Sequence, residues 1–396
     1  MGTEHRRVKA KVEQTLRDRA AIVGIGETRY SKNSGVSDLT LQLQGFKLAC
    51  DDAGLDPKEI DGIIAMTYGA CSEDYMTNFG LPNVKFAARP EMGGASQVAA
   101  LQLAAAVVDA GVCNYVLAIV GRNQRSGQRI GGGGMATMPP QFKMVAEHEM
   151  PFGVFIPAQW YAPMARRHMH EYGTTYEQLA AVSVQQRRHA ALNDNAMMRE
   201  PITVEDHHNS RWVVEPFRLL DCCLETDGVA AVIVAKTDRA KDMRNRPVYI
   251  SGVAEGHPES PMSITQRPDM CAFGVAKAAP RAFAMAGVGP EDIDVAELYD
   301  CFTFTVINQL EDIGFCAKGE GGPLVESGAT ALGGRLPVNT HGGLLSQGHV
   351  QGMNHICEAA RQLRGTAGDA QVKDAELALV SGYGDYGDGS VAVLRR

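Results

Sequence analysis

Two side chains late in the chain have the chemistry needed to move protons. Tyr299 opens the short sequence Y-D-C-F, and His349 lies in Q-G-H-V-Q-G at 347–352. Histidine is the natural general base near neutral pH, whereas tyrosine is a weak acid with an ordinary pKa of about 10. Most single histidines are structural, so the residue type alone does not make His349 catalytic. Either residue could act as the base.

A glycine pair opens an alanine-rich helical run. Gly93 and Gly94 precede a stretch that runs from Ala95 to Asp109. A backbone N–H at a helix N-terminus can hold developing negative charge, and one such donor contributes about 3 kcal/mol of transition-state stabilisation. Gly94 or Ala95 could supply this donor without a side chain. Close backbone packing at a strand–helix junction would explain the same glycines.

The composition limits the class of protein. The 396 residues, 45% of them hydrophobic, can bury a large core and predict two domains or one fused double domain. A formal net charge of −8 argues against nucleic acid as the main partner. No apolar run approaches the length of a membrane span, and residues 1–19 are charged, without the apolar core of a signal peptide. We expect a solvated leader and a cytoplasmic location.

The nine cysteines are scattered along the chain and never follow a C-x-x-C spacing. Their odd number and their spacing fit neither a disulfide framework nor a zinc ribbon. Most are expected to be small buried hydrophobic residues. With no metal-ligand cluster and no obvious Schiff-base lysine in the sequence, we expect neither a metal nor a cofactor.

Hydrophobic periodicity predicts alternating strands and helices. Residues 20–26 predict a buried strand, and their G-x-G is only a weak dinucleotide-binding signal. Residues 39–53 predict an amphipathic helix, with Asp38 at its N-cap or in its first turn. Further helices are expected at 159–172 and 176–192, and further strands at 115–121, 229–235 and 377–382.

The chain also repeats itself. Residues 53–61, A-G-L-D-P-K-E-I-D, are echoed by residues 286–294, A-G-V-G-P-E-D-I-D. Each copy ends a helix with glycine, turns at proline and enters a strand. The order of the following elements is similar after each copy, which predicts two similar α/β halves. The alternative is that both copies are a common helix-to-strand turn.

Three segments resemble the thiolase superfamily, in its lipid-transfer-protein-like or sterol-carrier-type branch: 92–100, 296–302 and 339–349. Shorter matches at 123–127, 157–160, 169–173 and 209–212 extend the resemblance over nearly the whole chain after residue 20. It implies the thiolase fold, with two similar βαβαβαββ halves in five layers, α-β-α-β-α, and an inserted loop domain over the active site. The expected parts are a leader (1–19), an N-terminal half (20–121 and 219–245), a loop domain (122–218) and a C-terminal half (246–396).

The resemblance assigns roles to individual positions. Thiolases carry an acyl-accepting cysteine where Gly94 stands and a second cysteine near 381–387, where this chain has none. His349 matches the thiolase catalytic histidine, and Tyr299 replaces a histidine or asparagine of relatives. The other oxyanion or substrate-binding candidates are Ala95, His341, Ser346, Tyr383 and Gly384.

Three arginines are candidate contacts for the phosphates of CoA: Arg122, Arg125 and Arg129. A solvated basic loop would explain them equally well. The glycines at 131–134 indicate a flexible loop rather than a P-loop, because no G-K-[ST] follows. His148 is a further pocket candidate, although a solvent-facing position is favoured.

Within this branch, Y-D-C-F-T is typical of steroid side-chain-cleaving acyl-CoA aldolases. The resemblance therefore implies retro-aldol cleavage of a β-hydroxyacyl-CoA to a ketone or aldehyde and a shorter acyl-CoA, with a steroid side chain as one candidate. CoA enters only as part of the substrate. The reaction needs no covalent nucleophile and so tolerates Gly94. Those aldolases use a second tyrosine near the position of His349, and this chain departs from them there.

Two other functions remain open. One is a thiolase or acyltransferase without the usual cysteine, for which Cys301 is the only cysteine in the active-site motifs. The other is a non-catalytic acyl-CoA or lipid-binding protein. The resemblance also implies a homodimer and a separate small partner subunit with an OB fold and a zinc ribbon.

Overall fold

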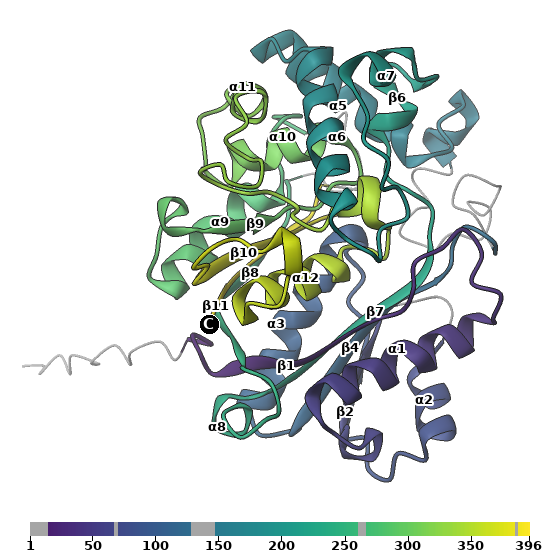
Figure 1. Ribbon diagram of the computed structural model, residues 1–396, viewed down its shortest axis with the longest axis vertical. Coiled ribbons are helices and arrows are strands. Elements are labelled where there is room, and N and C mark those ends of the chain that lie inside the picture. Colours follow the sequence, from purple (N-terminus) through teal and green to yellow (C-terminus); the bar gives the residue numbers. More distant parts are fainter. Residues whose placement is uncertain (1–14, 67–69, 128–146, 260–266, 385–386) are drawn as a thin grey trace, which may run out of the picture.

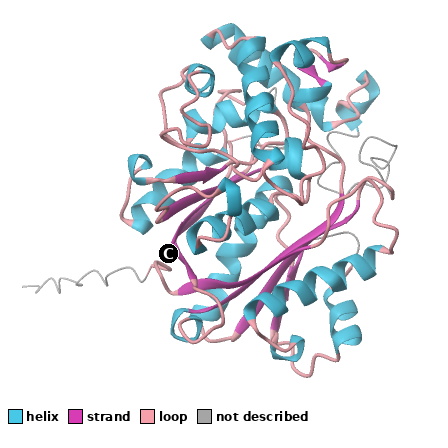
Figure 2. Ribbon diagram, in the orientation of Figure 1, coloured by secondary structure: helices cyan, strands magenta, loops and turns pink. Residues whose placement is uncertain are grey.

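The computed structural model describes residues 15–66, 70–127, 147–259, 267–384 and 387–396, so Arg129 and the glycines at 131–134 lie outside the described residues. Within this part of the chain one mixed sheet has nine strands in the order β3-β2-β4-β7-β1-β8-β11-β10-β9. They are β1 Ala20–Glu27, β2 Gly62–Ala65, β3 Phe86–Ala88, β4 Tyr115–Asn123, β7 Asp227–Lys236, β8 Val248–Gly256, β9 Val295–Glu297, β10 Leu377–Tyr383 and β11 Gly389–Arg395. Figure 2 shows the strands in magenta and the helices around them in cyan.

The sheet divides into two half-sheets at β1 and β8, which pair only at Ala21–Tyr249 and Ile22–Val248. The principal helices are α1 Asp38–Ala53, α2 Ser72–Phe79, α3 Ser96–Asp109, α5 Pro157–Tyr172, α6 Tyr176–Ala191, α7 Val204–Asn209, α9 Gly274–Ala286, α10 Thr303–Asp312, α11 Gly321–Glu326 and α12 Met353–Arg364. Each half-sheet therefore has helices available to cover both of its faces.

The layers follow from which helices contact which strands. α3 and α12 contact strands of both half-sheets and lie between them (Figure 1). α1 covers the outer face of the first half-sheet, while α9 covers the outer face of the second and α10 packs against α9. Three hydrophobic clusters fill the spaces between these layers. The predicted five-layered α-β-α-β-α thiolase fold is confirmed.

The sequence echo marks the same turn in both halves. α1 ends at Gly54 and α9 at Gly287, each with a left-handed backbone, φ +75° and φ +72°. The aspartate that closes each copy then anchors a later strand. Asp61 accepts N–H bonds from Asn114 and Tyr115 at the start of β4, and Asp294 accepts them from Glu376 and Leu377 at the start of β10. The repeat is thus structural as well as sequential.

Gly24 and Gly26 serve packing between β1 and α1. A Cβ on Gly26 would stand 2.4 Å from the backbone nitrogen of Ala49, and one on Gly24 2.5 Å from the Ala49 carbonyl oxygen. Only glycine lets the helix lie this close to the strand. The G-x-G at this position therefore has a structural explanation that requires no dinucleotide.

The segment between β4 and β7 carries α5, α6 and α7, which lie together at the top of Figure 1. α6 contacts α10, α11 and a π-helical turn at Gly343–Gln347. The predicted bounds of α5 and α6 are correct to within two residues. Among the described residues, no helix combines the length and apolar character needed to cross a bilayer.

Two local expectations need correction or refinement. Asp38 lies in the first turn of α1, and the N-cap is Ser37, whose hydroxyl accepts the N–H of Thr40. Asp18, assigned to a solvated leader, instead accepts hydrogen bonds from Ser251 and Arg395. The last residues of the expected leader are therefore attached to the C-terminal half.

Candidate active site

Tyr299 and His349 meet in the structure. The Tyr299 hydroxyl lies 3.2 Å from Nε2 of His349, and both residues are largely buried. Tyr299 follows β9, while His349 lies just before α12. The opposite ring nitrogen, Nδ1, is 3.2 Å from the side-chain oxygen of Gln124, which can only accept a hydrogen bond. Nδ1 therefore carries the proton, and Nε2 accepts the hydrogen bond from Tyr299.

The protonation of His349 is set by its surroundings. Burial lowers its pKa to about 4; the positive charges of Arg122 and His355 act in the same direction, and the negative charge of Asp300 opposes them. The backbone N–H of His349 donates to the Thr226 hydroxyl at 2.8 Å, which fixes the ring's position. His349 is therefore neutral over the neutral pH range and has a base lone pair at Nε2.

The backbone of Tyr299 is held from two sides. Its N–H donates to the hydroxyl of Ser381 at 3.2 Å, and its carbonyl accepts from the Gln309 side chain at 2.6 Å. The Ser381 hydroxyl donates in turn to the Gln309 oxygen, also at 2.6 Å. Strand β10 and helix α10 thereby position the tyrosine that follows β9. Sequence reasoning missed both supports, which lie 82 and 10 residues from Tyr299.

Gly94 is the position that most constrains the chemistry. A Cβ built on Gly94 would lie 2.2 Å from Cζ of Tyr299 and 2.4 Å from its hydroxyl oxygen. On another side of the ring, a Cβ on Gly352 would lie 2.8 Å from Cδ2 of Tyr299, and Gly352 has φ +79°. The phenol thus lies against two glycine backbones. Gly352, the second glycine of G-H-x-x-G, must be glycine for two reasons. The Tyr299 ring leaves no room for a Cβ, and the turn needs a positive φ at this position.

Two of the expected oxyanion donors are already engaged. The Ala95 N–H donates to the Met92 carbonyl at 3.0 Å, and the Gly384 N–H donates to the Asp388 carbonyl at 2.8 Å. The Tyr383 side chain packs in the outer core of the C-terminal half, with its ring centroid 4.6 Å from that of Phe273. These bonds correct the expectation that Ala95 and Gly384 present free N–H groups, and Tyr383 is a core residue.

Two residues of the 339–349 segment also have other partners. The Ser346 hydroxyl accepts a hydrogen bond from Arg187 on α6 at 3.0 Å. Nδ1 of His341 lies 2.9 Å from a carboxylate oxygen of Glu297. Each side chain is fully or almost fully buried and bonded within the protein, and its contact with substrate stays a prediction.

The candidate CoA arginines differ from one another. Arg122 lies at the end of β4, close enough to lower the pKa of His349. Arg125 donates its backbone N–H to Asp227. His148, the other pocket candidate, is exposed. Cys301 is 8% exposed, in keeping with a buried structural cysteine.

Behind Tyr299 lies a buried group of charged side chains that the sequence did not single out. His355 on α12 has Nε2 3.1 Å from Asp300 and Nδ1 3.8 Å from Glu297. Both carboxylates are fully buried and flank Tyr299 in sequence, and the ring of His355 lies 6.4 Å from that of Tyr299. The only available sequence signal was two acids close to a candidate catalytic tyrosine.

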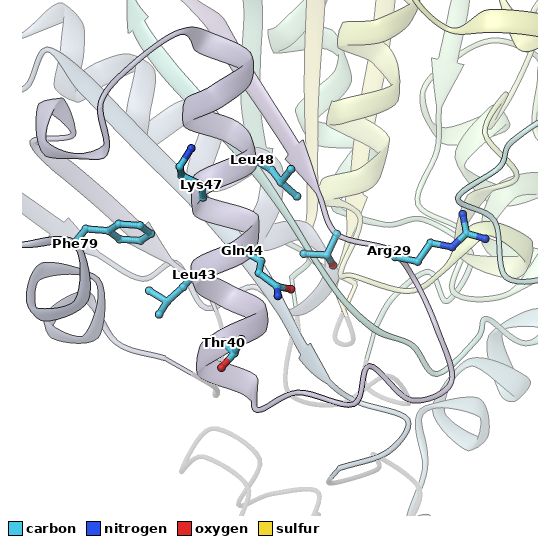
Figure 3. A pocket seen from close by; sticks show the side chains of 8 residues that line it. Arg29, Thr40, Leu43, Gln44, Lys47, Leu48 and Phe79 are labelled. Carbon is cyan, nitrogen blue, oxygen red and sulfur yellow. The ribbon is translucent and has the colours of Figure 1, made fainter.

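A separate surface hollow of about 510 Å³ lies over α1 (Figure 3). Its lining comes from α1, the end of α2 and the segment after β1: Thr28, Arg29, Thr40, Leu43, Gln44, Lys47, Leu48 and Phe79. It includes neither Tyr299 nor His349. Arg29 donates to the backbone carbonyl of Asp194, and Lys47 pairs with Asp51.

The fold and site together define a thiolase-fold enzyme without the acyl-accepting cysteine. Residues 256–396 match the family described as thiolase C-terminal domain-like. A steroid side-chain-cleaving aldolase of Thermomonospora curvata is 43% identical over 88% of this chain and 91% of its own. The 17-hydroxy-3-oxo-4-pregnene-20-carboxyl-CoA lyase of Mycobacterium tuberculosis is 41% identical over 89% of this chain and 93% of its own.

An acetyl-CoA acetyltransferase of Methanothermobacter thermautotrophicus is 35% identical over 96% of this chain and 99% of its own. Among solved structures, the Ltp2-ChsH2(DUF35) aldolase aligns with a TM-score of 0.90 and 40% identity, covering 96% of this chain and 98% of that one. The chain belongs to the thiolase superfamily, in the lipid-transfer-protein-like branch that contains these aldolases. It is an enzyme of the carbon–carbon lyase class.

Proposed function

We propose that this enzyme cleaves a β-hydroxyacyl-CoA by a retro-aldol reaction, and that its substrate carries a steroid side chain. Two relatives above 40% identity are a steroid side-chain-cleaving aldolase and a pregnene carboxyl-CoA lyase, which supports the substrate class. The products are a ketone or aldehyde and a shorter acyl-CoA. CoA takes part only as the substrate's carrier, and no other cofactor is required by the mechanism below.

The observation that carries this proposal is the contact between Gly94 and Tyr299. A thiolase or acyltransferase working through a cysteine needs a side chain where Gly94 stands. Here that space is filled by the Tyr299 phenol, with its Cζ 2.2 Å from the required Cβ. Because two heavy atoms cannot lie so close, a nucleophile at 94 and a phenol at 299 in this position exclude each other. This argues against an acyltransferase that works through a nucleophile at position 94, despite the 35% identity to an acetyl-CoA acetyltransferase, and the product assay below tests the version without that cysteine.

In the proposed mechanism, Tyr299 and His349 act as one proton-transfer unit. The substrate's β-hydroxyl gives its proton to the Tyr299 oxygen while the Tyr299 proton passes to Nε2 of His349. The Cα–Cβ bond breaks, its electron pair enters the thioester as an enolate, and the hydroxyl carbon becomes the product carbonyl. The proton then returns through Tyr299 to Cα. One proton leaves oxygen and reaches carbon, so neither water nor free CoA is consumed.

The low pKa of His349 suits this cycle. A neutral imidazole is available to accept the proton, and burial makes the imidazolium unstable enough to return it promptly. The positive end of α3, which begins at Ser96 directly after the glycine pair, favours negative charge on the enolate. We assign no oxyanion role to the N–H groups of Ala95 and Gly384, because both are bonded within the protein.

The proposal extends to assembly. The Ltp2-ChsH2(DUF35) aldolase pairs its thiolase-like chain with a second protein, which supports a separate small partner subunit for this chain. A homodimer is supported by the edge strand β3, which among the described residues pairs with β2 alone and so offers its other side to a second copy. Arg122, Arg125 and Arg129 remain the proposed contacts for the CoA phosphates.

A product assay tests the function. The purified chain, with and without a DUF35-type partner, receives matched β-hydroxyacyl-CoA and β-ketoacyl-CoA substrates, each with and without free CoA. We expect carbonyl release from the hydroxy substrate without consumption of CoA. CoA-dependent cleavage of the keto substrate alone would establish a thiolase. Tight binding with no turnover of either would support a lipid-binding protein.

A further inference from the structure

The buried charges behind Tyr299 do not balance without a cation. Glu297 and Asp300 are both fully buried, and their ion-pair partners are histidines: His341 and His355 for Glu297, and His355 for Asp300. A buried carboxylate is costly unless a positive charge or hydrogen bonds compensate it. His355 is the group that lies between the two.

The two carboxylates beside His355 favour a positive charge on its ring. Asp300 also accepts the N–H groups of Leu344 at 2.9 Å and Leu345 at 3.1 Å. The second ring nitrogen of His341 lies 3.4 Å from the amide nitrogen of Asn354. Burial opposes charge on His355, but Asp300 and Glu297 outweigh it and raise its pKa to about 9.

We propose that His355 is a positioning residue of the lyase site: an imidazolium between Glu297 and Asp300 that holds the Tyr299 segment in place and keeps His349 neutral. Both carboxylates flank Tyr299, so the cation ties β9 and its following segment to α12. The titratable groups facing His355 are Glu297 from β9, Tyr299 and Asp300 after it, and His341, whose ring lies 4.9 Å away.

The link to His349 is electrostatic. A cation at His355 disfavours a second cation at His349, as does Arg122, whereas Asp300 alone would favour one. Removing the charge of His355 also leaves Asp300 uncompensated, and both changes raise the pKa of His349. The base would then be protonated at a pH where the native base is free. This part of the inference rests on the proposed role of His349 in the lyase reaction.

The first experiment tests the charge without any substrate. Histidine ¹⁵N chemical shifts of the whole native protein, with the two signals assigned by their loss in His355→Gln and His349→Asn, report the charge of each ring. We expect His355 to be cationic and His349 neutral at pH 7. A neutral His355 at pH 7 would overturn the proposal, whatever reaction the enzyme catalyses.

The second experiment measures kcat/KM against pH. In His355→Gln the acidic limb should move up by about one pH unit, because a nearby like charge has been removed. His168→Gln is the matched control, since His168 is equally buried and pairs with Glu311 at 2.7 Å outside the site. It should lower stability without moving the limb. If His355→Gln lowers kcat/KM equally at every pH and leaves the acidic limb of the profile in place, His355 has only a structural role.

A charge-balanced variant keeps the test informative if His355→Gln does not fold. The double variant His355→Gln with Glu297→Gln removes one positive and one negative charge, so it should fold more stably than His355→Gln alone.

Metal analysis completes the test, because the ring and carboxylate atoms of Glu297, His341 and His355 lie within 4.8 Å of one another. If the purified protein contains a stoichiometric metal and unfolds when that metal is removed, the proposal that His355 is an imidazolium is wrong.

Discussion

The Tyr299 hydroxyl lies 2.4 Å from the point where a Cβ on residue 94 would stand, so the glycine and the tyrosine determine each other. The missing cysteine is therefore more than the loss of a nucleophile. It is the condition that allows a phenol to occupy the position above the N-terminus of α3 and to bond His349.

Gly94→Cys should abolish lyase activity without producing a thiolase. The new side chain must displace the Tyr299 ring, which we expect to cost about 1–3 kcal/mol of stability, as overpacking commonly does. Thermal unfolding and the product assay check this. The double variant Gly94→Cys with Tyr299→Ala relieves the clash with the ring but not the one with the Tyr383 carbonyl oxygen, 2.4 Å from the Cβ, so it should recover only part of the lost stability and no lyase activity. Full lyase activity in Gly94→Cys would contradict the steric argument.

Tyr299→Phe should lower kcat by about a hundred- to ten-thousand-fold, the range expected on removing a group that transfers a proton. The ring remains between Gly94 and Gly352, so the unfolding temperature should change little. Steady-state kinetics and a melting curve measure the two effects. A variant with unchanged kcat would show that the hydroxyl takes no part in the reaction.

His349→Asn tests the base and its linkage to stability. The folded pKa of His349 is lowered from 6.5 to about 4, so the neutral ring stabilises the fold above the unfolded pKa, and that contribution is lost as the pH falls toward 4. The variant should lose activity and should show a smaller drop in stability between pH 6.5 and 4. Urea unfolding at several pH values measures this. Identical pH dependence in both proteins would mean that His349 is not held neutral by the fold.

Gln124→Leu removes the acceptor that keeps the proton of His349 on Nδ1. The loss of one hydrogen bond of about 1–1.5 kcal/mol should lower kcat about ten-fold and change KM little. Gln185→Leu is the control, because Gln185 bonds Thr330 in another part of the molecule. If Gln185→Leu lowers kcat as much as Gln124→Leu does, the lower kcat of Gln124→Leu reflects a general loss of stability and not the position of the proton on His349.

Part of the site was predictable because its signals are short. Tyr299 and His349 stand in compact motifs rich in glycine and acids, and the structure brings these two predicted residues together. Ser346, His341 and Ala95 lie in the same kinds of motif, yet their polar atoms bond other parts of the protein. A motif identifies a segment near the site but not which of its side chains face the reacting atoms.

The amino-acid sequence by itself determined the alternation of strands and helices, the repeated turn that ends at Gly54 and Gly287, and the absence of a cysteine at Gly94. These depend on periodicity and turn chemistry, which act over a few neighbouring residues. Only the tertiary structure decided why Gly94 must be glycine and that His355 lies between Glu297 and Asp300. Such contacts join segments tens to hundreds of residues apart, and their distances exist only once both half-sheets have packed around α3 and α12.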